Sequence, residues 1–228
     1  MFNAQSVRLR IAFAAMAASF VLPSVAAAQN KFSVTPWVGS YFALSKFYDN
    51  DLDLTTIGGT GTAPIQVSQN NTAMFGLRVS IPIGATLAAE GSFGYAKSDV
   101  FFRVVDFNNN GGFDLSTTDK GSVVIGSLRA VIKPRRSNLS IILGGIVVHH
   151  GGSFWNDPAI DGKLTSFGGV VGFGLRANVT PRFPIDIRAE ANLYSFDPDK
   201  GDNTSLGFYP GKFQQDLVFS VGVPLGGK

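Results

Sequence analysis

The chain has 228 residues and no cysteine, which excludes disulfides, thiolate metal sites and cysteine nucleophiles. Its net charge is +3, but two of its 19 basic residues, Arg8 and Arg10, lie among the first 28, leaving 17 basic against 16 acidic residues. With no long basic run, this balance argues against a nucleic-acid partner. The 27 Gly, 20 Phe, 5 Tyr and 2 Trp, with hardly any helix-periodic segment, are typical of an all-β membrane protein.

The first 28 residues have the three parts of a cleavable signal peptide. Arg8 and Arg10 form a basic region, residues 11–25 are apolar, and residues 26–28 are the small residues that a signal peptidase requires. The apolar run is too short and too rich in Ala to favour a membrane-spanning helix. We therefore predict export, removal of residues 1–28, and one mature β-barrel domain over residues 29–228, beginning at Gln29.

Eight segments of the mature chain have the sequence pattern of strands. Most alternate between apolar and polar residues, which indicates two faces in different surroundings. Each has roughly the length that a tilted strand needs to cross a bilayer. In chain order they are residues 32–42, 73–83, 87–95, 123–133, 139–148, 167–179, 185–194 and 216–223.

One face of these segments is apolar, and the other is rich in Gly and Ser. The clearest case is the seventh segment, in which Ile185, Ile187 and Leu193 alternate with charged and amide residues. The fifth segment, residues 139–148, is apolar on both faces, so its orientation stays open. The residues predicted to face lipid elsewhere include Val38, Phe42, Phe75, Leu77, Val79, Leu87, Phe93, Leu128, Ile132, Phe167, Val171, Phe173, Leu175, Leu217, Phe219 and Val221.

The connections between the segments alternate in length. Long polar connections span about residues 43–72, 96–122, 149–166 and 195–212, whereas short ones lie near residues 83–85, 134–137 and 180–183. Long external loops and short periplasmic turns are the pattern of outer-membrane barrels. We therefore predict an all-β fold, an eight-stranded antiparallel up-and-down transmembrane β-barrel with both chain ends in the periplasm.

The placement of charge is the strongest sign that lipid lies outside this barrel. Of the 16 acidic residues, 12 fall in the long connections. No charge falls on a predicted lipid-facing position, which agrees with the cost of a charge in hydrocarbon, and a closed interior must pair the charges that it holds. A lipocalin-type soluble barrel would have the reverse arrangement. The predicted interior charge network consists of Arg78, Glu90, Arg129, Arg176, Asp186, Arg188, Glu190 and Asp216.

A specific group within this network follows from the turn near Gly84. If that turn is centred on Gly84, Arg78 and Glu90 face each other on neighbouring strands. If the next connection is roughly symmetric, Arg129 approaches Glu90 from the other side. We therefore expect a cluster of Arg78, Glu90 and Arg129 bridging three strands.

The signal sequence, the opening segment Phe32–Gly39 and the closing segment Asp216–Val223 resemble those of small eight-stranded outer-membrane barrels. The family is the outer-membrane β-barrel domain family of the OmpA barrel, OmpX and OmpW. The resemblance spans the mature chain and rests on pattern. It implies residence in the Gram-negative outer membrane, contact with outer-membrane lipid, and insertion by the barrel-assembly machinery.

Residues Asp106–Gly111 resemble the first half of a calcium loop, with oxygen ligands at alternate positions and a glycine turn. Asp114 is a candidate later ligand, but the twelfth position is Thr117, where such loops place a bidentate Glu. Asn- and Gly-rich tips are also what any surface loop uses to turn. We therefore assign no metal to this loop.

His149, His150 and Ser153 raise the possibility of catalysis, because lipid A deacylases of the outer membrane use a His, Ser and acidic set near the rim. Those enzymes place His and Ser two residues apart, and here the spacings are four and three. The nearest candidate acid, Glu190, is predicted inside the barrel. The favoured interpretation is a polar strand end without catalytic residues.

An eight-stranded barrel is just wide enough for its own side chains, which disfavours a general diffusion porin. We expect a non-enzymatic outer-membrane protein with a packed polar interior, no cofactor, and a role in envelope integrity or surface interaction. The alternative is a narrow conduit or binding protein for small hydrophobic molecules, as in OmpW-like proteins. A lipid A-modifying enzyme is the remote third hypothesis.

Overall fold

The structure, a computed structural model, describes residues 32–53, 62–104, 115–156, 164–180, 183–196 and 213–226. The predicted signal peptide and its cleavage site lie outside these residues. So does the candidate calcium loop up to Asp114. Within the described part of the chain, no helix is long and apolar enough to cross a membrane.

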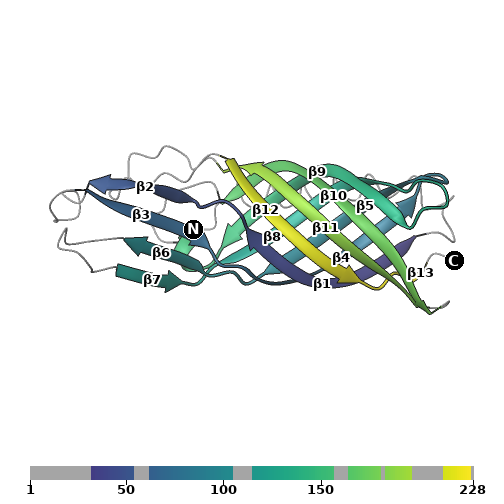
Figure 1. Cartoon of the computed structure of the whole chain (residues 1–228), viewed down its shortest axis with the longest axis horizontal. Coiled ribbons are helices and arrows are strands. Elements are labelled where there is room, and N and C mark those ends of the chain that lie inside the picture. Colours follow the sequence, from purple (N-terminus) through teal and green to yellow (C-terminus); the bar gives the residue numbers. More distant parts are fainter. Residues whose placement is uncertain are drawn as a thin grey trace, which may run out of the picture.

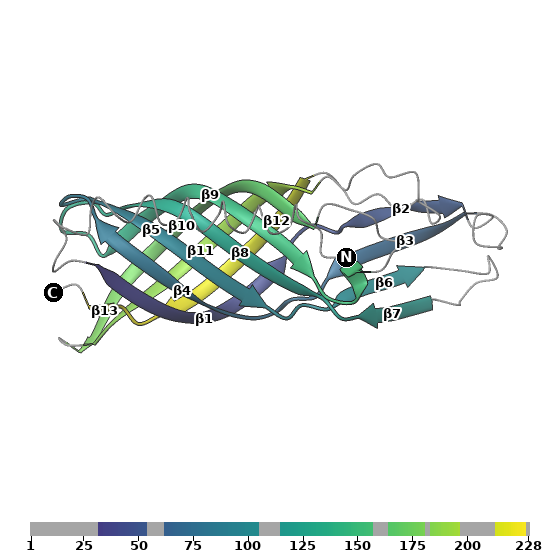
Figure 2. The ribbon, with the colours of Figure 1, turned by 180° about the vertical axis from the view of Figure 1, so that it is seen from behind.

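Eight antiparallel strands form a closed barrel, which confirms the predicted fold (Figures 1 and 2). Each strand pairs with the next, and the last pairs with the first from Trp37 opposite Gly222 to Ala43 opposite Asp216. A short strand, β13 (Leu225–Gly226), continues the last strand's line along the first. The barrel strands are β1 (Ser33–Ala43), β4 (Thr72–Pro82), β5 (Leu87–Ala96), β8 (Ser122–Ile132), β9 (Leu139–Gly151), β10 (Thr165–Thr180), β11 (Phe183–Ser195) and β12 (Phe213–Gly222).

The outer surface of the barrel is apolar. Val38 and Phe173 are each about two thirds exposed, at 66% and 65%, and many outward residues on the other strands are similar large aliphatics or aromatics. None of the Asp, Glu, Lys or Arg residues in these eight strands points outward. Such a belt would be costly in water and suits hydrocarbon, in which closure of the sheet also pairs the backbone groups. The protein is thus a transmembrane barrel of the outer-membrane type.

Strand β9, whose orientation the sequence leaves open, turns Ser140, Ile142 and Ile146 inward. Leu139, Ile141 and Leu143 face outward. Its inward face is apolar because Ile142 packs with Ala88 and Val131 near the turn end of the barrel, and Ile146 joins a larger apolar cluster toward the other end.

Four further strands form a second sheet that projects from one end of the barrel (Figures 1 and 2). They are β2 (Tyr48–Asp53), β3 (Thr62–Gln69), β6 (Val100–Val104) and β7 (Leu115–Asp119), in the order β2-β3-β6-β7. The expectation that residues 43–72 and 96–122 are loops is therefore wrong. Ala63, Ile65 and Val67 alternate along β3 and are buried. Pro64 obscures this pattern in the sequence, because proline is uncommon inside a strand.

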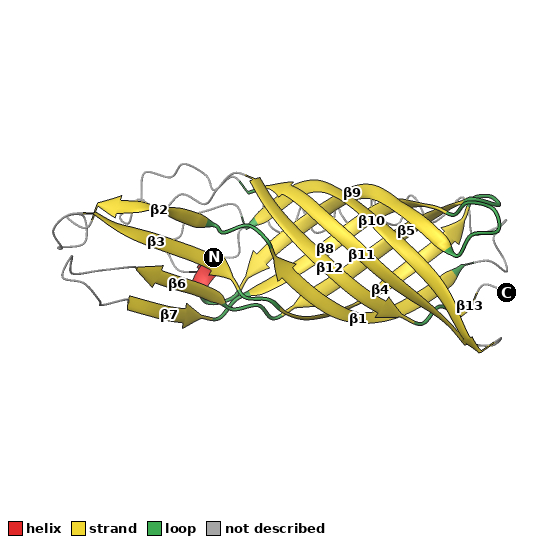
Figure 3. Ribbon diagram, viewed as in Figure 1, coloured by secondary structure: helices red, strands yellow, loops and turns green. Residues whose placement is uncertain are grey.

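Short turns close the opposite end of the barrel (Figure 3). In the turn after β8, the amide of Ser137 donates to the carbonyl of Pro134 at 3.1 Å. Arg136 has a φ of 63°, in the left-handed region, where the third position of a type II turn usually holds Gly or Asn. A side chain in this conformation costs about 1–3 kcal/mol. Among the described residues, one short 3-10 helix, η2 (Phe154–Asn156), follows β9 at the end of the barrel that carries the projecting sheet.

We expect the substitution Phe173→Arg to destabilise the folded barrel by about 2–4 kcal/mol, because it places a charge against the hydrocarbon core. Phe173→Leu, which keeps the position apolar, should cost far less. The measurement is reversible urea unfolding in lipid vesicles. Equal stability of the two variants would show that Phe173 does not face lipid.

Candidate functional site in the barrel interior

A cluster of five charged side chains lies at the middle of the barrel interior. It joins Glu90 of β5 and Glu190 of β11 to Arg78, Arg129 and Arg188, and all five side chains are nearly inaccessible. Arg188 binds Glu90 in a fork, with Nη1 2.6 Å from Oε1 and Nη2 2.9 Å from Oε2. These two residues come from strands that are not neighbours, so the ion pair spans the barrel.

The other two arginines complete the cluster. Arg129 Nη1 lies 2.6 Å from Glu190 Oε1, and Arg129 Nε lies 3.4 Å from Glu90 Oε1. Arg78 Nη2 lies 3.7 Å from Glu190 Oε1. Each carboxylate therefore contacts more than one guanidinium, which is the arrangement that buried charges require.

A second group of charges links this cluster to the turn end of the barrel. Arg176 Nε donates to Asp186 Oδ1 at 2.9 Å, and Arg188 Nη2 lies 3.5 Å from Asp186 Oδ2. The Arg176 side chain is 40% exposed, so the chain of ion pairs runs from mid-depth to the barrel mouth.

Trp37 and two glycines fix the position of Arg78. The Arg78 guanidinium carbon lies 4.7 Å from the centre of the Trp37 ring, within reach of a cation–π contact. Its Nη2 also donates to Ser220 Oγ. A Cβ on Gly76 would lie 2.5 Å from the Trp37 ring, and a Cβ on Gly94 would lie 2.9 Å from it. Glycine at these positions therefore makes room for the indole.

The register corrects one part of the expected cluster. Glu90 is opposite Arg129, but Arg78 is opposite Ser92, and Ser80 is the residue opposite Glu90. The amides of Ile83 and Gly84 both donate to the carbonyl of Leu87, so the turn is centred one residue beyond Gly84. This moves the pairing by two residues and keeps every side chain on its predicted face.

Asp216 lies apart from the arginine cluster, beside the hydroxyl groups of Tyr41 and Tyr194. It is directly opposite Asn192 on β11 and Ala43 on β1, toward the outer end of the barrel. The structure thus divides the eight predicted interior charges into a linked set of seven and a separate carboxylate.

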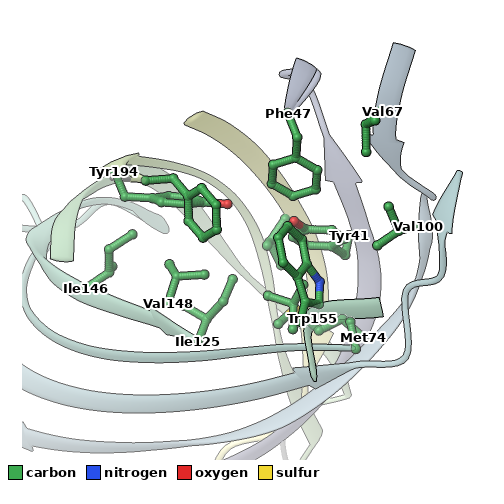
Figure 4. Close-up of a cluster of buried hydrophobic side chains, with 14 of the residues drawn as sticks. Tyr41, Phe47, Val67, Met74, Val100, Ile125, Ile146, Val148, Trp155 and Tyr194 are labelled. Atoms are coloured by element: carbon green, nitrogen blue, oxygen red, sulfur yellow. The ribbon is translucent and has the colours of Figure 1, made fainter. Parts of the chain in front are cut away.

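The outer half of the interior, toward the projecting sheet, is largely apolar apart from the polar residues around Asp216, which corrects the expectation of a polar interior throughout. Buried side chains from β8, β9, β10 and β12 fill it, among them Ile125, Ile146, Val148, Val170 and Val218. They form one cluster with Phe47, Trp155 and Phe196, and with Val67 and Val100 of the projecting sheet (Figure 4). The hydrophobic core is thus continuous from the barrel into the sheet.

His150 is fully buried in this cluster. Its ring centre lies 5.1–5.5 Å from those of Phe47, Trp155 and Phe196, and its Nε2 lies 3.4 Å from the Tyr194 hydroxyl. This position explains why sequence alone could assign His150 no partner, since these aromatic residues come from three separate segments.

The candidate catalytic residues do not form one site. Ser153 Oγ donates to Asp119 Oδ1 at 2.7 Å, and this hydrogen bond lowers the pKa of Asp119. His149 Nδ1 lies 2.9 Å from Thr165 Oγ1, and Glu190 belongs to the arginine cluster. Within the described part of the chain, no group of His, Asp or Glu side chains is arranged to hold a metal ion.

No model of a known protein family matches the chain, and no curated protein sequence matches it. The solved structures that are similar to it include three outer-membrane or surface proteins. The crystal structure of outer membrane protein OprG from Pseudomonas aeruginosa is 12% identical, with 86% of this chain and 97% of that one covered and a TM-score of 0.49. AlkL, solved by solid-state NMR in lipid bilayers, is 12% identical, with coverages of 86% and 92% and a TM-score of 0.46. Neisserial surface protein A is 14% identical, with coverages of 84% and 96% and a TM-score of 0.42.

We expect Glu90→Leu and Arg188→Met each to cost roughly 3–5 kcal/mol, because each leaves its partner charged and buried. The double variant should cost less than the sum by at least about 1 kcal/mol, since neither member of the fork is stranded. Combining Glu90→Leu with Arg78→Met should show a smaller coupling, because Arg78 forms its ion pair with Glu190. Urea unfolding in vesicles measures all five variants. Strict additivity for Glu90 and Arg188 would contradict the observed fork.

Proposed function

We propose that this protein is a non-enzymatic outer-membrane protein that acts at the cell surface and supports envelope integrity. The proposal rests on one observation: the barrel is filled by its own side chains, and a separate folded sheet projects from one end of it. The barrel supplies the membrane anchor, and the sheet supplies the contact surface.

The filling of the barrel argues against conduction of polar solutes. From the arginine cluster to the outer mouth, inward side chains such as Arg78, Tyr41, Met74 and Val148 are at most a few per cent exposed. A water-soluble molecule would have to separate bonded charges and then cross a packed apolar layer. Both steps carry a large free-energy cost.

The projecting sheet offers a polar face for contacts. The register places Gln66, Arg103 and Ser116 in one row across β3, β6 and β7, and Ser68, Phe101 and Thr118 in the next. All six are partly or fully exposed, whereas Ile65, Val67 and Val104 on the other face are buried. A flat face of hydroxyl, amide and guanidinium groups with one aromatic ring suits recognition of another macromolecule.

The surroundings of the candidate catalytic groups support a non-enzymatic role. His150 is enclosed by aromatic rings, and Ser153 is bonded to Asp119 instead of a histidine. We also propose that residues 1–28 are removed on export and that the barrel-assembly machinery inserts residues 29–228. The protein recovered from outer membranes should then begin at Gln29.

A second candidate function, binding or passage of small hydrophobic molecules, has one observation in its favour. The outer half of the interior is lined by Ile125, Ile146 and Val148 and is continuous with the aromatic cluster around Trp155. Asp216, beside Tyr41 and Tyr194, is the acidic side chain that the described residues place in this half of the interior.

Two measurements test the proposal. Proteoliposomes should take up neither arabinose nor the apolar dye N-phenyl-1-naphthylamine faster than protein-free vesicles. A strain lacking the gene should lose detergent resistance and regain it with the wild type. The deletion strain should not regain detergent resistance with the Ile65→Asp variant, which buries an unpaired carboxylate in the projecting sheet.

Ser68→Asp adds the same charge to the exposed face of the same strand and should keep the sheet folded, as judged by protease resistance. Both variants should reach the outer membrane and show the heat-dependent gel shift of a folded barrel. Full detergent resistance with Ile65→Asp would contradict a role for the sheet. Dye uptake by the wild type would favour the second candidate function.

A further inference from the structure

The turn between β8 and β9 carries a compact group of basic side chains. Its residues 133–138 include Lys133, Arg135 and Arg136, and the two arginines are exposed. The other described turns at this end, residues 83–86 and 223–226, contain no charged residue. The acidic group at this end of the barrel, Asp186, is buried and bonded to Arg176. The turn therefore concentrates positive charge at the end of the barrel that faces the periplasm, opposite the projecting sheet.

Hydrogen bonds hold this turn in place. The amide of Lys133 donates to the carbonyl of Thr86 at 2.7 Å, which ties the turn to its neighbour. The amide of Arg176 donates to the carbonyl of Asn138 at 2.8 Å, which ties it to β10. The internal bond from Ser137 to Pro134 completes a rigid frame. Its cations are thus held close together before any partner binds.

Two features show that this arrangement is unfavourable in isolation. Arg136 occupies a left-handed backbone conformation in which Gly or Asn would be less strained. Burial and the nearby Arg176 guanidinium hold the pKa of Lys133 below its usual value. An anion would offset the like-charge crowding, and this directs the inference toward a negatively charged partner.

The partner's position follows from the apolar belt. Ile132 and Leu139, which flank the turn, are 38% and 59% exposed on the outer face, and Ile83 on the adjacent turn is 66% exposed. The hydrocarbon layer therefore reaches the base of this turn, and the basic side chains stand at the depth of the phospholipid head groups. We infer that the turn of residues 133–138 is a docking surface for anionic phospholipid head groups of the periplasmic leaflet.

Lipid binding by the purified full barrel tests this inference. Native mass spectrometry should show phosphatidylglycerol retained in preference to phosphatidylcholine. Each basic residue near a membrane surface contributes roughly a fivefold preference. The double variant Arg135→Gln, Arg136→Gln should therefore lower the apparent affinity for phosphatidylglycerol by about 10- to 30-fold and leave phosphatidylcholine binding unchanged. Raising the salt concentration should weaken the wild-type preference in the same way.

A matched control is Lys97→Gln with Lys120→Gln, which removes two exposed charges at the opposite end and should leave the preference intact. A second variant, Arg136→Gly, removes charge and backbone strain together. It should fold at least as well as the wild type and still lose several-fold affinity. An unchanged preference in the arginine double variant, or an equal loss in the lysine control, would overturn the inference. If the arginine double variant kept its lipid preference but no longer cosedimented with isolated peptidoglycan, the inference would be overturned and the turn would be assigned to cell-wall binding.

Discussion

The interior of a narrow barrel in lipid has no bulk water to solvate charge, so Glu90 and Glu190 must obtain all of their stabilisation from the protein. They do so from three guanidinium groups on β4, β8 and β11. Because the fork between Arg188 and Glu90 spans the barrel, it fixes the spacing of strands that share no backbone hydrogen bonds. The small inward residues follow from this constraint. A Cβ on Gly144, for example, would lie 2.7 Å from the Cβ of Arg129, and one on Gly172 would lie 2.9 Å from the Cγ of Glu190.

The outer half of the interior is stabilised differently, and the difference bears on function. Aromatic residues from the barrel mouth, from residues 154–155 and from the start of the projecting sheet pack into one core. The apolar face of the four-stranded sheet, with Ile65, Val67 and Val104, belongs to the same cluster as the barrel residues, so the two parts bury each other's apolar side chains. Packing therefore couples the anchor to the proposed contact surface. A substitution at Phe47 or Trp155 would therefore also loosen the packing of the projecting sheet.

Much of the barrel could be predicted from sequence because its two faces meet opposite surroundings. The alternation along β11 and the absence of outward charge required no long-range information. The predicted inward position of all eight charged residues follows from the same alternation. Three features needed more. The orientation of β9 depends on two apolar clusters in the interior, one around Ile142 and one around Ile146, which come together from several strands. The opposition of Arg78 to Ser92 depends on where a turn is centred. The strands β2, β3, β6 and β7 lie between acidic, Asn- and Gly-rich residues, and their pairing is visible only in three dimensions.

The central claim is that the barrel interior is closed to water from the arginine cluster outward. The chain has no cysteine, so a single introduced thiol reports on its own surroundings. Val218→Cys is nearly isosteric and lies opposite Glu190, whereas Ser116→Cys lies on the exposed face of β7. In lipid vesicles a small, charged, water-soluble thiol reagent should modify Ser116→Cys rapidly and Val218→Cys only after unfolding in urea. Comparable reaction rates at both positions in the folded protein would contradict a closed interior.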